Sequence, residues 1–192
     1  MFERGFKAWC ERYSIEKRKE LGVKSSKRLD PYLLANSLGI KVWTPEDIPG
    51  LSREHIDTLL QNDGKTPSCW SAVTLVVGSK TLVILNSSHS IGRQASDLMH
   101  ELSHRILSHE PHQTEASPDG IMLLSAYEKQ EEDEADWLSA TLLLPRKALE
   151  FIKHSRLQDD VAAREYGVSI KMLKYRMSMT GVNKQYSISK SS

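Results

Sequence analysis

The sequence of 192 residues contains only two cysteines, Cys10 and Cys69, and lacks any apolar run long enough to cross a membrane. Two cysteines cannot build a disulfide framework, so both are expected to be free, buried thiols in a reducing compartment. A membrane helix needs about 20 mostly apolar residues, and Glu3, Arg4 and Lys7 interrupt the apolar core that a secretory signal would need. Internal repeats are also lacking. The sequence therefore predicts a cytoplasmic globular protein without a membrane partner.

The formal net charge of +1 is distributed unevenly along the chain. Residues 1–30 contain nine basic and five acidic residues, residues 31–145 contain seven and sixteen, and residues 146–192 contain ten and four. An acidic middle segment suits a cation-binding site. The basic ends could contact nucleic acid, but their charge density favours solvated helix faces.

Helical and strand patterns alternate along most of the chain. Periodicity and capping residues predict helices at 2–20, 30–39, 52–61, 128–144, 146–153, 157–166 and 170–177. Apolar and β-branched runs predict strands at 40–43, 71–77 and 81–85, the last two forming a hairpin. We expect an N-terminal helix (1–28), a core (29–150), a C-terminal helical extension (151–182) and a disordered tail (183–192).

The most informative stretch is an H-E-x-x-H motif, His100-Glu101-Leu102-Ser103-His104, within a segment of helical periodicity. Residues four apart lie above one another on a helix, so His100 and His104 can reach one metal ion. Glu101 lies about 100° further round, where it can hold a water at the metal without being a ligand. The bare motif also fits a surface helix with two solvated histidines. The apolar opposite face favours a buried helix, whose histidines and glutamate would need partners; this face consists of Ala95, Leu98, Met99, Leu102 and Ile106.

A third ligand is expected from the acidic start of the predicted helix 128–144. Glu132 and Asp136 lie one turn apart on one face, so one carboxylate can bind the metal while the other accepts a hydrogen bond from a ligand histidine. Small residues at Ala135, Ser139 and Ala140 would let this helix approach the motif helix closely. The alternative is a solvated acidic first turn that is stabilised by the helix dipole.

Two other patterns could indicate a functional role, but each favours a structural one. His109 and His112 do not have the spacing of an extended zinc motif with a third histidine, so we expect solvated loop residues. Residues 162–177 have the helix, glycine turn and helix pattern of a helix-turn-helix, with Lys171, Lys174 and Arg176 as basic residues. So few basic residues favour a packing unit over a DNA-reading element.

Taken together, these motifs resemble the ImmA/IrrE-type metallo-endopeptidases over roughly residues 28–182. The shared features are Leu29-Asp30-Pro31, Leu38-Gly39-Ile40 with Val42, Arg93, the H-E-x-x-H motif, residues 132–136, Leu142-Leu143-Leu144-Pro145, and Tyr166-Gly167-Val168-Ser169. Ser103 and Asp136 depart from the glycine and asparagine that are common in the family. Neither departure removes a ligand.

The resemblance implies an α+β, minimal zincin-like fold, in which a small twisted sheet packs on helices. It assigns His100, His104 and Glu132 as zinc ligands and Glu101 as the catalytic base, and it implies a helix-turn-helix repressor as substrate. Two imidazoles and one carboxylate suit Zn²⁺ well.

The transition state also needs a group that stabilises the oxyanion, and Tyr127, Arg93 and His109 are the candidates. Two other functions compete with proteolysis. One is a non-proteolytic regulator that binds a metal and a repressor or antitoxin, which the intact Glu101 disfavours. The other is direct DNA binding through the C-terminal helices.

Overall fold

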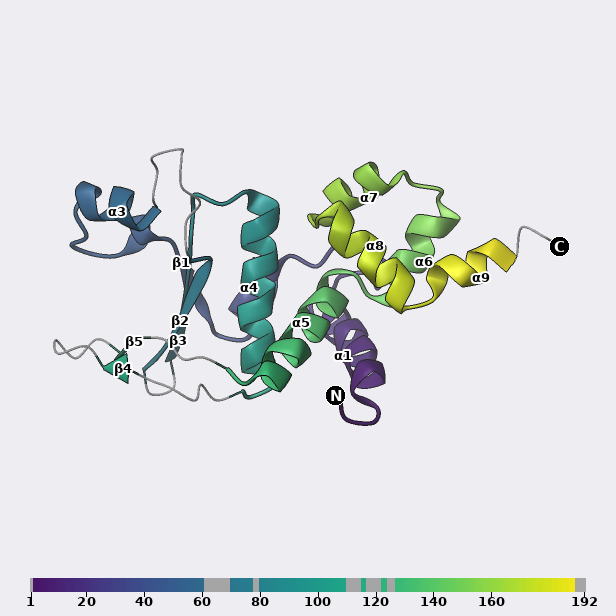
Figure 1. Ribbon diagram of the computed structural model, residues 1–192, viewed down its shortest axis with the longest axis horizontal. Helices are drawn as coiled ribbons and strands as arrows, with labels where there is room; N and C mark the ends of the chain where they lie inside the picture. The colour runs from purple at the N-terminus through teal and green to yellow at the C-terminus, as the bar shows by residue number, and fades with distance from the viewer. Residues whose placement is uncertain are drawn as a thin grey trace.

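The protein has an α+β fold, as predicted, in which most of the helices lie on one side of a small mixed sheet (Figure 1). The computed structural model describes residues 2–60, 70–77, 80–109, 115–116, 122–123 and 127–188. In chain order the helices are α1 (Phe6–Glu20), α2 (Pro31–Ser37), η1 (Pro45–Asp47), α3 (Arg53–Leu60), α4 (Ile91–Ile106), α5 (Lys129–Leu143), α6 (Arg146–His154), α7 (Asp159–Tyr166), α8 (Ile170–Met179) and α9 (Val182–Ile188). The strands are β1 (Lys41–Trp43), β2 (Ala72–Val77), β3 (Lys80–Leu85), β4 (Glu115–Ala116) and β5 (Met122–Leu123).

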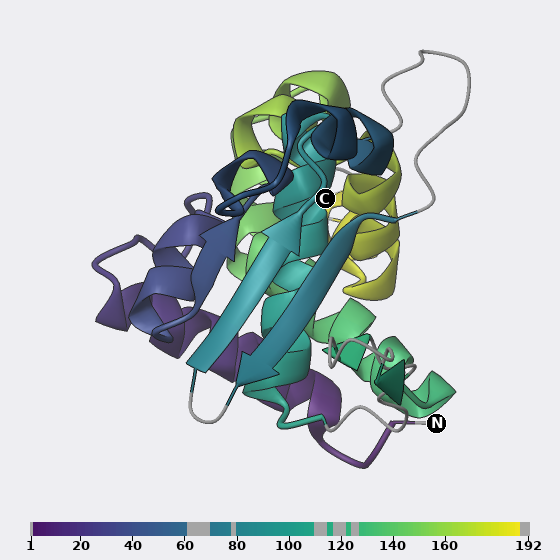
Figure 2. The ribbon, with the colours of Figure 1, turned by 90° about the vertical axis from the view of Figure 1, so that its left-hand side faces the viewer.

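The larger sheet has the order β1-β3-β2, with β3 in the centre. The predicted hairpin is confirmed, because β2 pairs antiparallel with β3 and places Thr74 opposite Val83. β1 pairs parallel with the other edge of β3. Side chains of β3 alternate in burial, since one face of the strand packs on α4, which lies directly behind the sheet in Figure 2. β2 is thus an edge strand beside α4.

Helix α4 carries the H-E-x-x-H motif through the middle of the molecule. Its first turn is capped by Ser90, whose hydroxyl accepts a hydrogen bond from the Arg93 amide at 3.4 Å. The predicted apolar face is confirmed: Ala95, Leu98, Met99 and Leu102 are buried, and Ile106 packs against the core from its edge. This face fixes the rotation of the helix about its axis and therefore the direction of the motif histidines.

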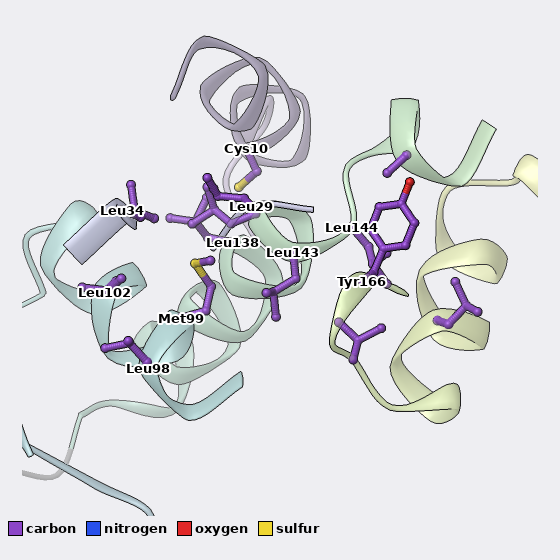
Figure 3. Packing of buried hydrophobic residues seen from close by; sticks show 14 of the residues in the cluster. Cys10, Leu29, Leu34, Leu98, Met99, Leu102, Leu138, Leu143, Leu144 and Tyr166 are labelled. Atoms are coloured by element: carbon purple, nitrogen blue, oxygen red, sulfur yellow. The ribbon is translucent and has the colours of Figure 1, made fainter. Parts of the chain in front are cut away.

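Helix α5 packs on α4 and contributes Trp137, Leu138, Leu142 and Leu143 to the core. Ala135 is fully buried, and Ser139 and Ala140 are nearly so, which agrees with the predicted close approach. In Figure 3, Met99 of α4 lies beside Leu138 and Leu143 of α5. Close packing along this contact holds the acidic start of α5 at a fixed place against α4.

Buried polar contacts join helix α1 to helix α5. Arg18 is fully buried, and its guanidinium donates to the Leu142 carbonyl at 2.6 Å and to the Ser14 hydroxyl at 2.6 Å. Arg176 of α8 is also fully buried and pairs with Glu11 at 2.7 Å. The expectation of solvated basic helix faces is wrong for these two arginines, because their donors bind carbonyl, hydroxyl and carboxylate oxygens inside the protein. Arg176 is therefore not part of a basic recognition surface.

Helices α6 to α9 lie on the side of α4 that faces away from the sheet (Figure 1). The chain turns between α7 and α8 at Gly167, whose φ of 67° lies in the left-handed region that favours glycine. The structure differs from the expectation of a disordered tail from residue 183, because α9 extends to Ile188; residues 189–192 lie outside the described residues. Within the described part of the chain, no helix is long and apolar enough to cross a membrane.

Candidate metal centre

The two motif histidines meet on one face of α4. The Nε2 atoms of His100 and His104 lie 3.0 Å apart, and their rings are inclined at 70°. Helical periodicity explains this pairing, since a separation of four residues brings side chains onto one face. His104 is buried, whereas the His100 side chain keeps 24% of its surface exposed. One histidine is therefore anchored in the core, and the other borders solvent.

Glu132, in the first turn of α5, brings a carboxylate to the same point. Its Oε2 lies 3.2 Å from Nε2 of His100, and its Oε1 lies 3.8 Å from Nε2 of His104. Ligand atoms of these three residues all lie within 4.8 Å of one another. Two imidazole nitrogens and one carboxylate that converge from two helices fit a divalent transition metal, and zinc in particular.

Asp136 lies behind His100, one turn further along α5 than Glu132. Nδ1 of His100 lies 3.0 Å from Oδ1 of Asp136, and this bond places the ring proton on Nδ1 and leaves Nε2 free to bind a metal. Burial lowers the pKa of His100, but the hydrogen bond and charge of Asp136, with Glu101 and Glu132, raise it above its usual value overall. For His104, burial and the neighbouring His100 lower the pKa to about 3, so that this imidazole is neutral.

Glu101 lies beside the three converging groups but is not among them. Its Oε2 accepts a hydrogen bond of 2.5 Å from the hydroxyl of Thr74 on β2. Burial raises the pKa of Glu101, while the Thr74 hydrogen bond and His100 oppose this increase. Sequence reasoning missed Thr74, because its role depends on how the sheet packs on α4. The only available signal was its place in a strand of the predicted hairpin.

The three candidates for oxyanion stabilisation lie in different places. The Tyr127 ring stacks on His104 at a centroid distance of 3.7 Å, and burial raises the pKa of Tyr127 to about 12, so that its hydroxyl remains a donor. Arg93 lies about two helical turns before His100. Its guanidinium donates to Ser71 at 2.9 Å and faces Asp97 at 3.7 Å.

His109 lies behind His104 rather than beside the converging ligand atoms. Its Nδ1 is 3.0 Å from Nδ1 of His104, on the side of that ring opposite Nε2. Only 7% of its surface is exposed, so the expectation of a solvated loop residue is wrong for His109. The backbone at the end of α4 folds this residue back onto the helix. His112 lies outside the described residues.

A cleft of about 480 Å³ opens beside His100, between α4, α5 and α8. Its wall includes Asp97, Asp136, Trp137 and Tyr175, so that it combines carboxylates with aromatic rings. Of His100, His104 and Glu132, only His100 is part of the wall of this cleft.

A helix that carries H-E-x-x-H, with a glutamate from a second helix converging on its histidines, is typical of metallopeptidases. Residues 55–178, more than half of the chain, match the Peptidase_M78 family, described as the IrrE N-terminal-like domain. The chain belongs to this family, which confirms the resemblance to ImmA/IrrE-type proteins.

Other comparisons add information on the fold. No curated protein matches the sequence. Among solved structures, the chain is similar to a Mycobacterium tuberculosis transcriptional regulator, with a TM-score of 0.50 and 15% sequence identity. The similarity covers 92% of this chain and 47% of that chain, so this protein spans about half the length of that structure. At this identity the likeness concerns the fold alone.

Proposed function

We propose that this protein is a cytoplasmic zinc-dependent endopeptidase, with the metal held by His100, His104 and Glu132. The observation that carries the proposal is the convergence of three ligand atoms, two imidazole nitrogens and one carboxylate oxygen, within 4.8 Å, with the non-ligating carboxylate of Glu101 beside them. A site that only held a metal for stability would have no use for Glu101 at that place. Zinc with three protein ligands supplies Lewis acidity, which acidifies water and polarises a peptide carbonyl.

Glu101 is the general base of the proposed reaction. Its carboxylate takes a proton from the attacking water and later delivers that proton to the nitrogen of the leaving amine. The Thr74 hydroxyl holds one carboxylate oxygen, so that the other is left for the water. Partial burial raises the pKa of Glu101, which makes the carboxylate a better proton acceptor than a solvated glutamate.

Tyr127 is the proposed donor to the oxyanion. Its stacking on His104 places it beside the ligand cluster, and its raised pKa keeps the hydroxyl protonated at neutral pH. Arg93 is engaged with Ser71 and Asp97, and His109 lies on the far side of His104. Both are therefore less suitable for this role.

The proposed substrate is a helix-turn-helix repressor, a choice that rests on the family to which the chain belongs. A segment of that repressor would lie in the cleft beside His100, where aromatic and acidic side chains can contact apolar and basic residues. Such a repressor acts in the cytoplasm, which is also the compartment expected for this protein.

Elemental analysis of the purified protein tests the metal centre. We expect one zinc per chain, lost in His100→Ala, His104→Ala and Glu132→Ala. Asp133→Ala is the matched control, because Asp133 is exposed and neighbours Glu132 on α5. Full zinc content in any of the three ligand variants would contradict the assignment.

Incubation with a purified candidate helix-turn-helix repressor tests the reaction itself. We expect cleavage that stops when a chelator removes the metal and returns when Zn²⁺ is added. Binding of the repressor without cleavage, in zinc-loaded protein, would replace the enzyme with a regulator that acts by binding.

A further inference from the structure

At the end of α4 the chain folds back and brings His109 into contact with His104. After Ile106 and Leu107, Ser108 adopts a φ of 57°, in the left-handed region. The Ser108 amide then donates to the Arg105 carbonyl at 3.2 Å, and the His109 amide donates to the His104 carbonyl at 3.0 Å. This pair of bonds is a Schellman motif, in which the second residue after the cap contacts the third-last residue of the helix. His109 therefore packs against His104 because of local backbone geometry.

The contact between the two side chains is a hydrogen bond inside the protein. Nδ1 of His104 and Nδ1 of His109 lie 3.0 Å apart, and Nε2 of His109 lies 3.5 Å from Oε2 of Glu134 on α5. Both histidines are buried, and the Glu134 side chain keeps only 16% of its surface exposed. Gln130 donates to the other Glu134 oxygen at 3.0 Å, which fixes the carboxylate.

Only one neutral arrangement of protons satisfies all of these contacts. The Glu134 carboxylate accepts but cannot donate, so Nε2 of His109 must carry the proton of that ring. Nδ1 of His109 is then an acceptor, and Nδ1 of His104 must donate to it. Nε2 of His104, which faces His100 and Glu132, is thereby left with a lone pair. The opposite tautomers would place a lone pair of His109 against a carboxylate.

We propose that His109 and Glu134 are positioning residues, which fix the tautomer and the ring orientation of His104 for metal binding. This inference rests on the proposed function in one respect, namely that His104 is a metal ligand. Each ligand histidine then has its own carboxylate from α5: Asp136 contacts His100 directly, and Glu134 acts on His104 through His109.

The helical geometry of α5 explains why the second contact needs an intermediate. Glu134 lies two residues after Glu132, about 200° round the helix, so that it points away from the ligand cluster. The His109 ring spans the distance between this carboxylate and the back of His104. Partners of this kind change metal affinity by roughly 10- to 100-fold when removed.

Nitrogen-15 NMR of the histidine rings in the metal-free, full-length protein measures the tautomers directly. We expect His104 to carry its proton on Nδ1 and His109 to carry its proton on Nε2. The signals are assigned with variants that each lack one histidine. A proton on Nε2 of His104 in the parent protein would overturn the proposal. This measurement needs no metal and no substrate, so it stands even if the proposed function fails.

Competition with a chromophoric chelator measures the consequence for Zn²⁺ binding. His109→Phe keeps a ring without nitrogen, and Glu134→Leu removes the acceptor; each should weaken zinc binding roughly 10- to 100-fold. Glu134→Gln should restore most of the affinity, because an amide oxygen can still accept from His109. Asp133→Ala is the control on the same helix.

The outcomes distinguish the positioning role of His109 and Glu134 from the metal centre itself. If the parent protein binds zinc, and His109→Phe is equally stable to heat and binds zinc as tightly, the positioning role is wrong and the metal centre stands. If His109→Phe does not fold, Glu134→Leu and Glu134→Gln provide the same comparison, and equal zinc affinity in the two would overturn the proposal. If the parent protein binds no zinc at all, the proposed function fails instead.

Discussion

The hydroxyl of Thr74 lies 2.5 Å from the carboxylate of Glu101, and this hydrogen bond joins the edge strand β2 to the helix that carries the metal ligands. The contact connects residues 27 positions apart in the sequence. It fixes one oxygen of the proposed base without involving a metal ligand. The sheet therefore has a role in the site beyond covering α4.

Replacing Thr74 by valine tests this role. Valine has nearly the same shape but no hydroxyl, so Thr74→Val should keep the zinc content and the fold. It should lower kcat/KM roughly 10- to 100-fold, since a hydrogen bond to a charged group contributes about 1.5–3 kcal/mol. Thr74→Ser should restore activity, because it returns the donor. Repressor cleavage by zinc-loaded proteins provides the measurement, and equal rates in all three proteins would show that the contact is only structural.

Replacing Tyr127 by phenylalanine tests the proposed oxyanion donor. The ring can still stack on His104, so we expect unchanged zinc affinity. Loss of one donor to a developing oxyanion lowers kcat by about 10² to 10³. The same cleavage assay at saturating repressor gives kcat. Parent activity in Tyr127→Phe would leave Arg93 as the next candidate to be tested in the same way.

The Glu11–Arg176 pair makes a prediction about stability. Arg176 is fully buried, and Glu11 also accepts a hydrogen bond from the Arg146 amide at 2.9 Å. Glu11→Gln leaves the guanidinium without its charged partner, which should lower the free energy of unfolding by about 3 kcal/mol. Urea unfolding measures this change, with the exposed Glu16→Gln on the same helix as control. Equal losses in both variants would refute a specific role for the pair.

Cys10 makes a prediction about alkaline pH. Burial raises the pKa of its thiol from 9.0 to about 12. Between these values the unfolded chain loses the proton while the folded protein keeps it, so stability is complete below pH 9 and falls as the pH rises, by about 1.4 kcal/mol per pH unit. From pH 8 to pH 10, the parent should lose about 1.4 kcal/mol more than Cys10→Ala in urea unfolding. Parallel losses would mean that the thiol ionises normally in the folded state.

Local periodicity made part of the site predictable from the sequence. His100 and His104 share a face because they are one helical turn apart, and an apolar back face oriented them. Glu132 and Asp136 were singled out by the same spacing, and the structure brings both to the His100 ring. In each case the deciding geometry lies within a single helix.

The contacts that sequence reasoning missed depend on geometry between elements or at a helix end. Thr74 reaches Glu101 only because β2 is the edge strand next to α4. His109 folds back because Ser108 adopts a left-handed conformation that glycine more often supplies, so this helix end had little signal in the sequence. The burial of Arg176 depends on Glu11, which is 165 positions away in the sequence.

The central claim is that Glu101 takes a proton during peptide hydrolysis, and Glu101→Gln tests it most directly. The amide is nearly isosteric, so zinc content and repressor binding should match those of the parent and of the control Glu16→Gln, which changes an exposed glutamate on α1. Cleavage of the repressor should fall by about 10² to 10⁴, because an amide cannot accept the proton. Cleavage at the parent rate by zinc-loaded Glu101→Gln would contradict the account.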